Sequence, residues 1–410
     1  MKYVFSNYTA SGVALGGIGA GSVEVRADGL LHDWLIFNNG VWTTLEKYRQ
    51  FYPLDERGFF LAVRAESGGR VAVRMLQSRG YILGGDPYKA PWLKPVKAVE
   101  YSGEPPLAKL KYIDDLPLEI SAEFLSPFIP GDLKSSSTPT VIIRIVVRNT
   151  SSSAVKAAVM AGLRAPFKRA AAKADGGIVT VKGLGEPDES PLRDGSMALA
   201  IRGGATSFAV VRAPGYEEYG FQRYEQTLEM LMAWINFRRE GRLQGPSAGE
   251  GQGLWALAAA SAELGPGEAK AIDVILAWYF PNHYDQFGER LGHYYENFFA
   301  DAHAVAEHVL RNFDYLYGET VKFHDALYGL EGLDSWVADL VASQLTTLVK
   351  ATWLTKDGRF ALWEGLGDKY YGGPSLNAFN TTDVIFYAFP TLLSLFPELA
   401  AKYLIQHAAH

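Results

Sequence analysis

One stretch near the end of the chain combines the residue types that bind and react with a sugar. Glu364 follows Trp363, and Tyr371 and Asn377 lie in the Gly- and Pro-containing loop that comes next. Aromatic rings can stack on the C–H face of a pyranose, while carboxylates and amides hydrogen-bond its hydroxyl groups. A carboxylate in such a place can also attack the anomeric carbon. The stretch therefore indicates a carbohydrate site with Glu364 as its candidate nucleophile.

Asp383 lies where that loop returns to a largely apolar run, residues 384–396. A side-chain oxygen at such a point can accept the unpaired first-turn N–H groups, so Asp383 is predicted to be a helix N-cap. Loops longer than about 12 residues inside a compact domain are usually functional. On spacing alone, a loop carboxylate and a helix cap explain Glu364 and Asp383 as well, and this structural alternative stays open.

The elements that precede this stretch have the pattern of an all-β domain. From Gly58 to Phe280 the sequence is mostly of period two, with Gly, Pro, Ser and Asp between the apolar segments. Many short strands with polar turns predict an antiparallel β-sandwich, with a hairpin turn at 149–153 and one helix at 224–242. Strand-like segments are 60–64, 71–74, 141–147, 155–163, 197–201, 208–211 and 271–280.

After Pro281 the period changes from two to that of a helix. Residues 285–312 and 333–353 carry apolar residues at helical spacing, with Asp334 as the cap of the second segment. The last helix is expected to start near Asp383, to be open to a break at Pro390 and to be followed by a helical segment from 398 to 410. His293, His303 and His308 do not share one helix face, so no metal site is predicted.

A glycine cluster at 16–21 invites comparison with a dinucleotide-binding loop. Its order does not fit G-x-G-x-x-G, and the following residues 23–26 alternate like a strand rather than a helix. We interpret the cluster as a tight, close-packed turn that leads into a β-strand.

Composition excludes several classes of function. The chain has 410 residues, 48% apolar residues, a net charge of −6 and no cysteine. An acidic chain without a Lys/Arg cluster does not favour nucleic acid or anionic membranes, and the absence of cysteine excludes thiolate chemistry. We read no signal peptide and no transmembrane segment, expect a cytoplasmic protein, and find no need for a metal or organic cofactor.

Two separated stretches resemble glycoside hydrolase family 116, the family of non-lysosomal glucosylceramidases and of bacterial and archaeal β-glucosidases. One comprises RFALWEG and NTTDVIFYAFPTLLSLFPEL, and the other comprises GVALGGIGAGSVEVRADG and HDWLIFNNG. The resemblance implies that Glu364 is the nucleophile and that Asp383 contacts the bound sugar. Trp363 and Tyr371 are weaker candidates for the pocket wall, with core packing as the alternative. The separation of Glu364 from Asp383 is longer than in many members, because of an insertion at 372–376.

The resemblance also implies a domain plan. We expect an N-terminal β-sandwich over 1–282, a linker helix region over 283–332 and the first helices of an (α/α)6 catalytic barrel over 333–410. In the family the general acid/base is an Asp far downstream of the nucleophile, and the only acid after Asp383 here is Glu398. The chain is therefore expected to be a truncated or split form: either a second polypeptide completes the barrel, or the sequence is a partial gene model.

Two functions follow from these expectations. The first is a retaining β-glycosidase that acts on a β-glucoside or glycolipid, with β-xylosides as a further substrate class. The second is a non-catalytic carbohydrate-binding or scaffold remnant of the same family, in which the sandwich survives and the chemistry is lost. A retaining glycosidase needs two carboxyl groups about 5–5.5 Å apart, so the missing acid/base separates the two hypotheses.

Overall fold

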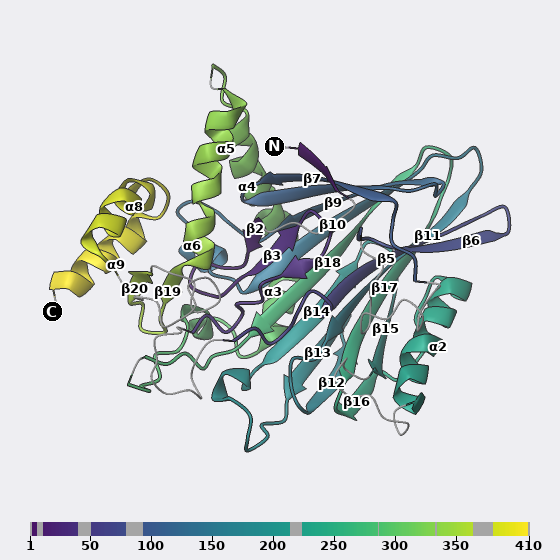
Figure 1. Cartoon of the computed structure of the whole chain (residues 1–410), viewed down its shortest axis with the longest axis horizontal. Helices are drawn as coiled ribbons and strands as arrows, with labels where there is room; N and C mark the ends of the chain where they lie inside the picture. Colours follow the sequence, from purple (N-terminus) through teal and green to yellow (C-terminus); the bar gives the residue numbers. More distant parts are fainter. Residues whose placement is uncertain are drawn as a thin grey trace.

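The computed structural model describes residues 2–5, 11–39, 51–78, 93–213, 224–285, 287–332, 334–363 and 380–408. Two antiparallel sheets form the body of the molecule (Figure 1). In spatial order, the ten-stranded sheet consists of β1 (Lys2–Phe5), β7 (Ala98–Glu104), β8 (Leu107–Ile113), β9 (Leu118–Leu125), β10 (Thr140–Asn149), β18 (Ala269–Tyr279), β14 (Ser196–Arg202), β13 (Ile178–Gly183), β12 (Ala170–Asp175) and β16 (Ala248–Gly251). The five-stranded sheet consists of β15 (Ala205–Arg212), β17 (Leu254–Leu264), β11 (Val155–Arg164), β5 (Phe59–Ser67) and β6 (Arg70–Met75).

The two sheets pack face to face, and each is also covered on its outer face. Ile143 of β10 and Val159 of β11 belong to the core between the sheets. The neighbouring Ile142 points the other way, into a second core against α3 (Ala302–Arg311) and α4 (Phe313–Tyr328). This double burial explains why the central strands read as continuous apolar runs rather than as an alternation.

The outer face of the five-stranded sheet is covered by α2 (Tyr224–Glu240) (Figure 1). Trp234 of α2 stacks on Phe60 of β5 with 5.4 Å between ring centroids. The short α1 (Leu133–Ser136) and the 3-10 helices η2 (Pro191–Arg193) and η4 (Tyr294–Asn297) lie in connections. The predicted antiparallel sandwich, its strands and the helix at 224–242 are confirmed.

A small sheet and a helical region complete the fold. The small sheet contains β2 (Gly12–Leu15), β3 (Val23–Arg26) and β4 (Leu31–His32). The helical region contains α5 (Ser335–Gln344), α6 (Thr346–Lys350), the hairpin strands β19 (Thr352–Leu354) and β20 (Phe360–Leu362), α8 (Thr382–Leu395) and α9 (Pro397–Ala408). Ile18 and Phe128 of the N-terminal part share one core with Phe396 and Leu399, which joins the two regions.

The glycine turn is confirmed as a close-packed turn. Gly16, Gly19 and Gly21 all have positive φ angles, at 147°, 67° and 86°. A side chain at any of them would overlap backbone atoms, so the sequence uses glycine where the chain passes close to other elements.

The predicted hairpin turn at 149–153 is wrong, because β10 and β11 belong to different sheets. The connection crosses from one sheet to the other, and Asn149 holds it. Its amide Nδ2 donates to the carbonyls of Ser153 and Leu264 at 2.8 and 2.9 Å. The polar run is a bridge between layers, which turn composition alone does not distinguish from a hairpin.

The predicted helix at 285–312 is wrong over its first half. Asp285 Oδ1 accepts the backbone N–H groups of Phe287 and Glu289, and Gly288 and Gly292 have φ angles of 87° and 65°, so this segment is a loop. The helix begins after Asp301, whose carboxylate accepts the N–H of Ala304 at 2.8 Å. Local capping therefore overrides the apolar periodicity.

The predicted helix at 333–353 is shorter than expected, and a further helix, α4, was not predicted. Asp334 is the N-cap residue, as expected, but Leu345 interrupts the helix and Trp353 lies in β19. Pro390 does not break α8, and the helical segment after 397 is confirmed as α9. None of the helices in the described ranges is long and apolar enough to cross a membrane.

Candidate active site

The β19–β20 hairpin carries the chain to the candidate nucleophile. Thr352 pairs with Leu362, and Leu354 pairs with Phe360. The N–H of Trp363 donates to the carbonyl of Ala351 at 3.1 Å, which extends the hairpin by one residue. Trp363 is buried, with 6% of its surface exposed. Glu364, Tyr371 and the insertion at 372–376 lie outside the described residues.

Asn380 brings the two ends of this segment together. Its backbone N–H donates to the carbonyl of Leu362 at 2.8 Å, and its Oδ1 accepts the N–H of Leu362 at 2.9 Å. Asn380 adopts a φ angle of 51°, a left-handed conformation that Asn tolerates better than most residues. Leu362, the residue before Trp363, therefore contacts the segment that leads into α8, and no sequence pattern other than the Asn itself indicated this contact.

Asp383 is not the N-cap residue that was predicted. Thr381 is the N-cap of α8, and Asp383 lies in the first turn with an exposed side chain. Hydrogen bonds from the Thr381 hydroxyl and from backbone N–H groups at the helix start lower the pKa of Asp383. The carboxylate is thus held ionised at neutral pH, as an acceptor for hydroxyl groups.

Two aromatic residues share the exposed face of α8 with Asp383. Phe386 and Tyr387 follow at the i+3 and i+4 positions and are 70% and 80% exposed. Their rings meet edge to face with 5.6 Å between centroids. Sequence reasoning missed this pair, although its spacing from an acidic residue at a helix start was visible.

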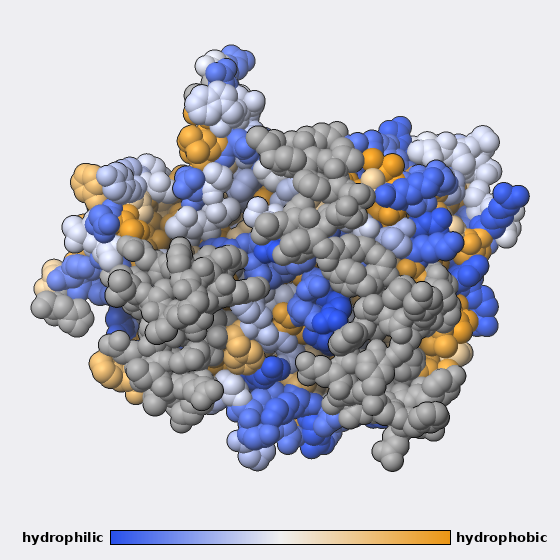
Figure 2. All heavy atoms as spheres, in the orientation of Figure 1, coloured by the Kyte–Doolittle hydropathy of each residue, from blue (hydrophilic) through white to orange (hydrophobic). Residues whose placement is uncertain are grey.

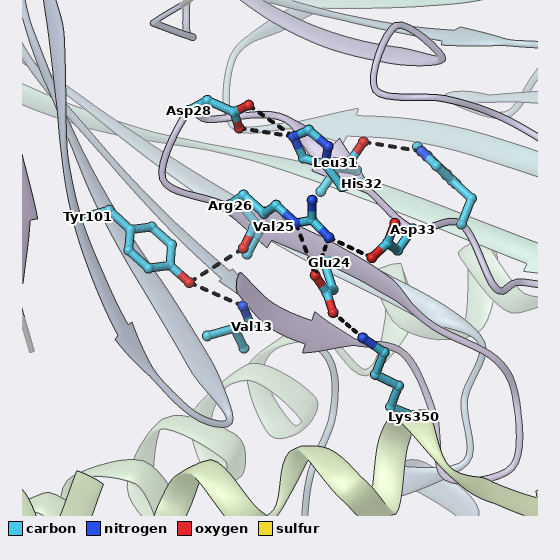
Figure 3. Close-up of polar contacts among 11 residues, drawn as sticks. Val13, Glu24, Val25, Arg26, Asp28, Leu31, His32, Asp33, Tyr101 and Lys350 are labelled. Atoms are coloured by element: carbon cyan, nitrogen blue, oxygen red, sulfur yellow. Dashed lines mark hydrogen bonds and ion pairs between the residues drawn. The ribbon is translucent and has the colours of Figure 1, made fainter. Parts of the chain in front are cut away.

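A buried group of charges ties α6 to the small sheet (Figure 3). Lys350, the last residue of α6, forms an ion pair with Glu24 of β3. The other oxygen of Glu24 pairs with Arg26 at 2.8 Å, and Arg26 also pairs with Asp33 at 2.5 Å. Asp28 contacts His32 Nε2 at 2.9 Å beside them. Since Glu24 and Asp33 are both paired with cations, we assign these charges to structure rather than to acid/base chemistry.

Two fully buried histidines lie under β19. His283 and His293 stack with 4.7 Å between ring centroids and 9° between planes, and Trp353 meets His283 edge-on at 4.1 Å. Burial lowers the pKa of His293 to about 4 and holds the pKa of His283 well below its usual value. Parallel rings do not aim their nitrogen lone pairs at one ion, and no group of three or more metal-ligating side chains occurs among the described residues.

Comparison with known proteins bears on the N-terminal three quarters of the chain. Residues 12–316 match the family described as "beta-glucosidase 2, glycosyl-hydrolase family 116 N-term". None of the curated proteins matches the chain.

Some solved structures match this chain at low identity. A polysaccharide lyase is 12% identical with a TM-score of 0.32, over 67% of this chain and 34% of that protein. A family GH92 α-mannosidase from Bacteroides thetaiotaomicron is 12% identical with a TM-score of 0.37, over 87% of this chain and 42% of that protein. The chain therefore spans less than half the length of either structure.

Proposed function

Since the chain belongs to glycosyl-hydrolase family 116, we propose that it forms part of a retaining β-glycosidase in which Glu364 is the nucleophile. The observation that carries the proposal is the contact between Leu362 and Asn380, two residues before Glu364 and three before Asp383. The family match ends at residue 316, so the roles of Glu364 and Asp383 rest on this contact and on their motifs.

In the proposed reaction, a Glu364 carboxylate oxygen attacks the anomeric carbon as the bond to the leaving oxygen breaks. A general acid protonates that oxygen, and water later attacks the glycosyl-enzyme and returns the Glu364 carboxylate. Asp383, held ionised at the start of α8, accepts a hydrogen bond from a sugar hydroxyl group. Trp363 and Tyr371 contribute to the pocket wall. The substrate class is a β-glucoside or glycolipid, with β-xylosides as a further class.

We propose that the described helices are the start of an (α/α)6 barrel over 333–410, after a sandwich over 1–282 and a linker over 283–332. Further helices, belonging to the same protein or to a second polypeptide, would cover its exposed apolar faces and provide the acid/base; the barrel with these helices is called the completed assembly below. Such faces usually mark an interface, and apolar surface is visible over α5 and α8 in Figure 2. The residues concerned are Trp336, Leu340 and Val341 of α5, Phe386, Tyr387 and Leu393 of α8, and Leu404 and Ile405 of α9.

An activated 2-fluoro-β-glucoside tests the nucleophile. The fluorine slows hydrolysis of the glycosyl-enzyme, and a good leaving group needs little acid assistance, so the label is expected on Glu364 in the completed assembly. Glu364→Gln should abolish labelling, and Asp383→Asn should weaken it while the protein stays folded. A label on any other residue, or equal labelling of Glu364→Gln, would refute the assignment.

The second candidate function is a non-catalytic carbohydrate-binding remnant. It is the function expected if Glu398, which pairs with Lys402 at 3.4 Å on α9, is not the acid/base and no other carboxyl group takes that role. Glucoside binding to the completed assembly, without labelling and without turnover, would select this function over the first.

A further inference from the structure

The terminal residue pair of the β19–β20 hairpin is held on both strands by residues outside the hairpin. Thr352 and Leu362 face each other across the hairpin, and both are buried. Asn380 grips Leu362 through two hydrogen bonds. Thr352, on the other strand, forms hydrogen bonds with residues of the N-terminal part that lie more than 300 positions earlier.

Asn38 provides the first of these contacts. Its amide Nδ2 donates to the carbonyl of Thr352 at 3.0 Å, and its side chain is buried. The backbone of Asn38 has a φ angle of 46°, a conformation that costs free energy in most residues and is kept where the surroundings fix it. The next residue, Asn39, accepts the N–H of Tyr284 at 2.7 Å, so the Asn pair fastens both the hairpin and the linker.

Gly19 provides the second contact. Its N–H donates to the hydroxyl Oγ1 of Thr352 at 3.0 Å, and that hydroxyl donates to the carbonyl of Leu348 at 2.7 Å. A side chain on Gly19 would come within 2.4 Å of Cβ of Leu354, so the glycine turn lies directly on β19. The strand therefore cannot move closer to this turn without overlap of atoms.

Two strained asparagines therefore hold the two members of one residue pair. Among the described residues, the non-glycine positions with positive φ are Asp33, Asn38 and Asn380. Asn38 holds Thr352 and Asn380 holds Leu362. Thr352 pairs with Leu362, and Leu362 precedes Trp363, the residue before Glu364.

We propose that Asn38 and Gly19 are positioning residues, which set the place of strand β20, the strand that leads into Glu364. The inference rests on the proposed function and gives the N-terminal part a direct share in the reaction geometry. Misplacement of a reacting group by about 1 Å can cost about 100-fold in rate.

Hydrogen exchange tests the structural half on the 410-residue chain itself. In Asn38→Ala, amides of the peptide 351–363 are expected to exchange at least about tenfold faster than in the wild type, because local opening becomes easier. Asn149→Ala is the matched control, since it also removes a buried amide that donates to backbone carbonyls, but between the two sheets. It should leave hairpin exchange unchanged. Unaltered hairpin exchange in Asn38→Ala would overturn the proposal.

Labelling of Glu364 by the 2-fluoro-β-glucoside tests the kinetic half in the completed assembly. Asn38→Ala and Thr352→Val are expected to lower the labelling rate constant by about 10- to 100-fold, with little change in the concentration for half-maximal labelling. Thr352→Ser, which keeps the hydroxyl, should retain the wild-type rate, as should Asn149→Ala. Wild-type rates in both Asn38→Ala and Thr352→Val would refute the proposal.

Hydrogen exchange and labelling together distinguish a failure of the positioning role from a failure of the proposed function. If the wild type is not labelled at Glu364, the proposed function fails, and hydrogen exchange alone decides whether Asn38 positions the hairpin. If labelling occurs and is insensitive to Asn38, the function stands and the positioning role is rejected.

Discussion

Lowering the pH from 7 to 5 is expected to destabilise the folded chain through the stacked pair His283 and His293. A carbonyl only accepts, so His283 Nδ1 donates to Gly292 O at 3.1 Å and His293 Nε2 donates to Phe37 O at 3.2 Å. Both rings are fully buried. Protonation would place two positive charges side by side in the core under β19.

The sign follows from the two pKa values of His293. Burial lowers the folded pKa to about 4 from the ordinary 6.5, with Glu296 opposing the shift and Arg290 adding to it. Between these values the unfolded chain binds the proton and the folded chain does not, so stability falls as the pH falls. At about 1.4 kcal/mol per pH unit, the complete loss is about 3 kcal/mol, of which about 2 kcal/mol is lost by pH 5.

His283 acts in the same direction. Burial is again the largest cause of its lowered pKa, followed by the charge of His293 and, more weakly, by Arg359 and Arg290. The two histidines together should therefore lower the free energy of unfolding by more than His293 alone. Their contributions are not simply additive, because the two rings are in contact.

Urea unfolding followed by tryptophan fluorescence at pH 7, 6 and 5 measures this slope. His293→Phe keeps a flat ring in the stack but cannot titrate, so its stability should fall by about 2 kcal/mol less than that of the wild type over this range. Its stability at pH 7 is expected to be lower, because Phe37 O loses a donor. Equal pH slopes for wild type and His293→Phe would refute the reasoning.

Three substitutions should each lower the free energy of urea unfolding. Gly19→Ala is expected to cost about 2–4 kcal/mol, because its Cβ would lie 2.4 Å from Cβ of Leu354 at a φ angle of 67°. Tyr295→Phe should cost about 2–3 kcal/mol, since its buried hydroxyl accepts the N–H of Phe280 at 3.1 Å and donates to the carbonyl of the same residue at 2.7 Å. Lys350→Met should cost about 2 kcal/mol. This is less than the usual cost of breaking a buried ion pair, because Glu24 keeps its ion pair with Arg26.

Matched controls exist for all three. Gly176→Ala has a φ angle of 56° but open space around the added Cβ, so it should cost less than Gly19→Ala. Tyr315→Phe removes an exposed hydroxyl that contacts Asp132, and Lys97→Met removes an exposed ion pair with Asp115, so each should change stability by less than about 1 kcal/mol. A control as costly as its test variant would contradict the packing argument for that residue.

Local pattern carried the sequence-based expectations that the structure confirms. Short strand-like runs such as 71–74 become strands because alternate side chains face opposite sides of a sheet, whatever the partner strand is. The glycine order at 16–21 indicates a tight turn because only glycine fits such close backbone contact. The acidic charge and the family resemblance were likewise legible without coordinates, and the family match over 12–316 agrees with that resemblance.

Tertiary structure decided which segments of the chain contact one another. The run 149–153 reads as a turn in either case, and only the packing of two sheets makes it a bridge between them. The carboxylate of Asp301 caps α3 by accepting the N–H of Ala304, and this contact sets where the loop ends and the helix begins. The hydrogen bond from Asn38 to Thr352 joins residues 314 positions apart, and no local spacing in the sequence predicts such a contact. The sequence by itself thus determined most of the strands and led to the prediction of Glu364 as nucleophile, whereas the long-range packing of the chain determined how the strand before Glu364 is held.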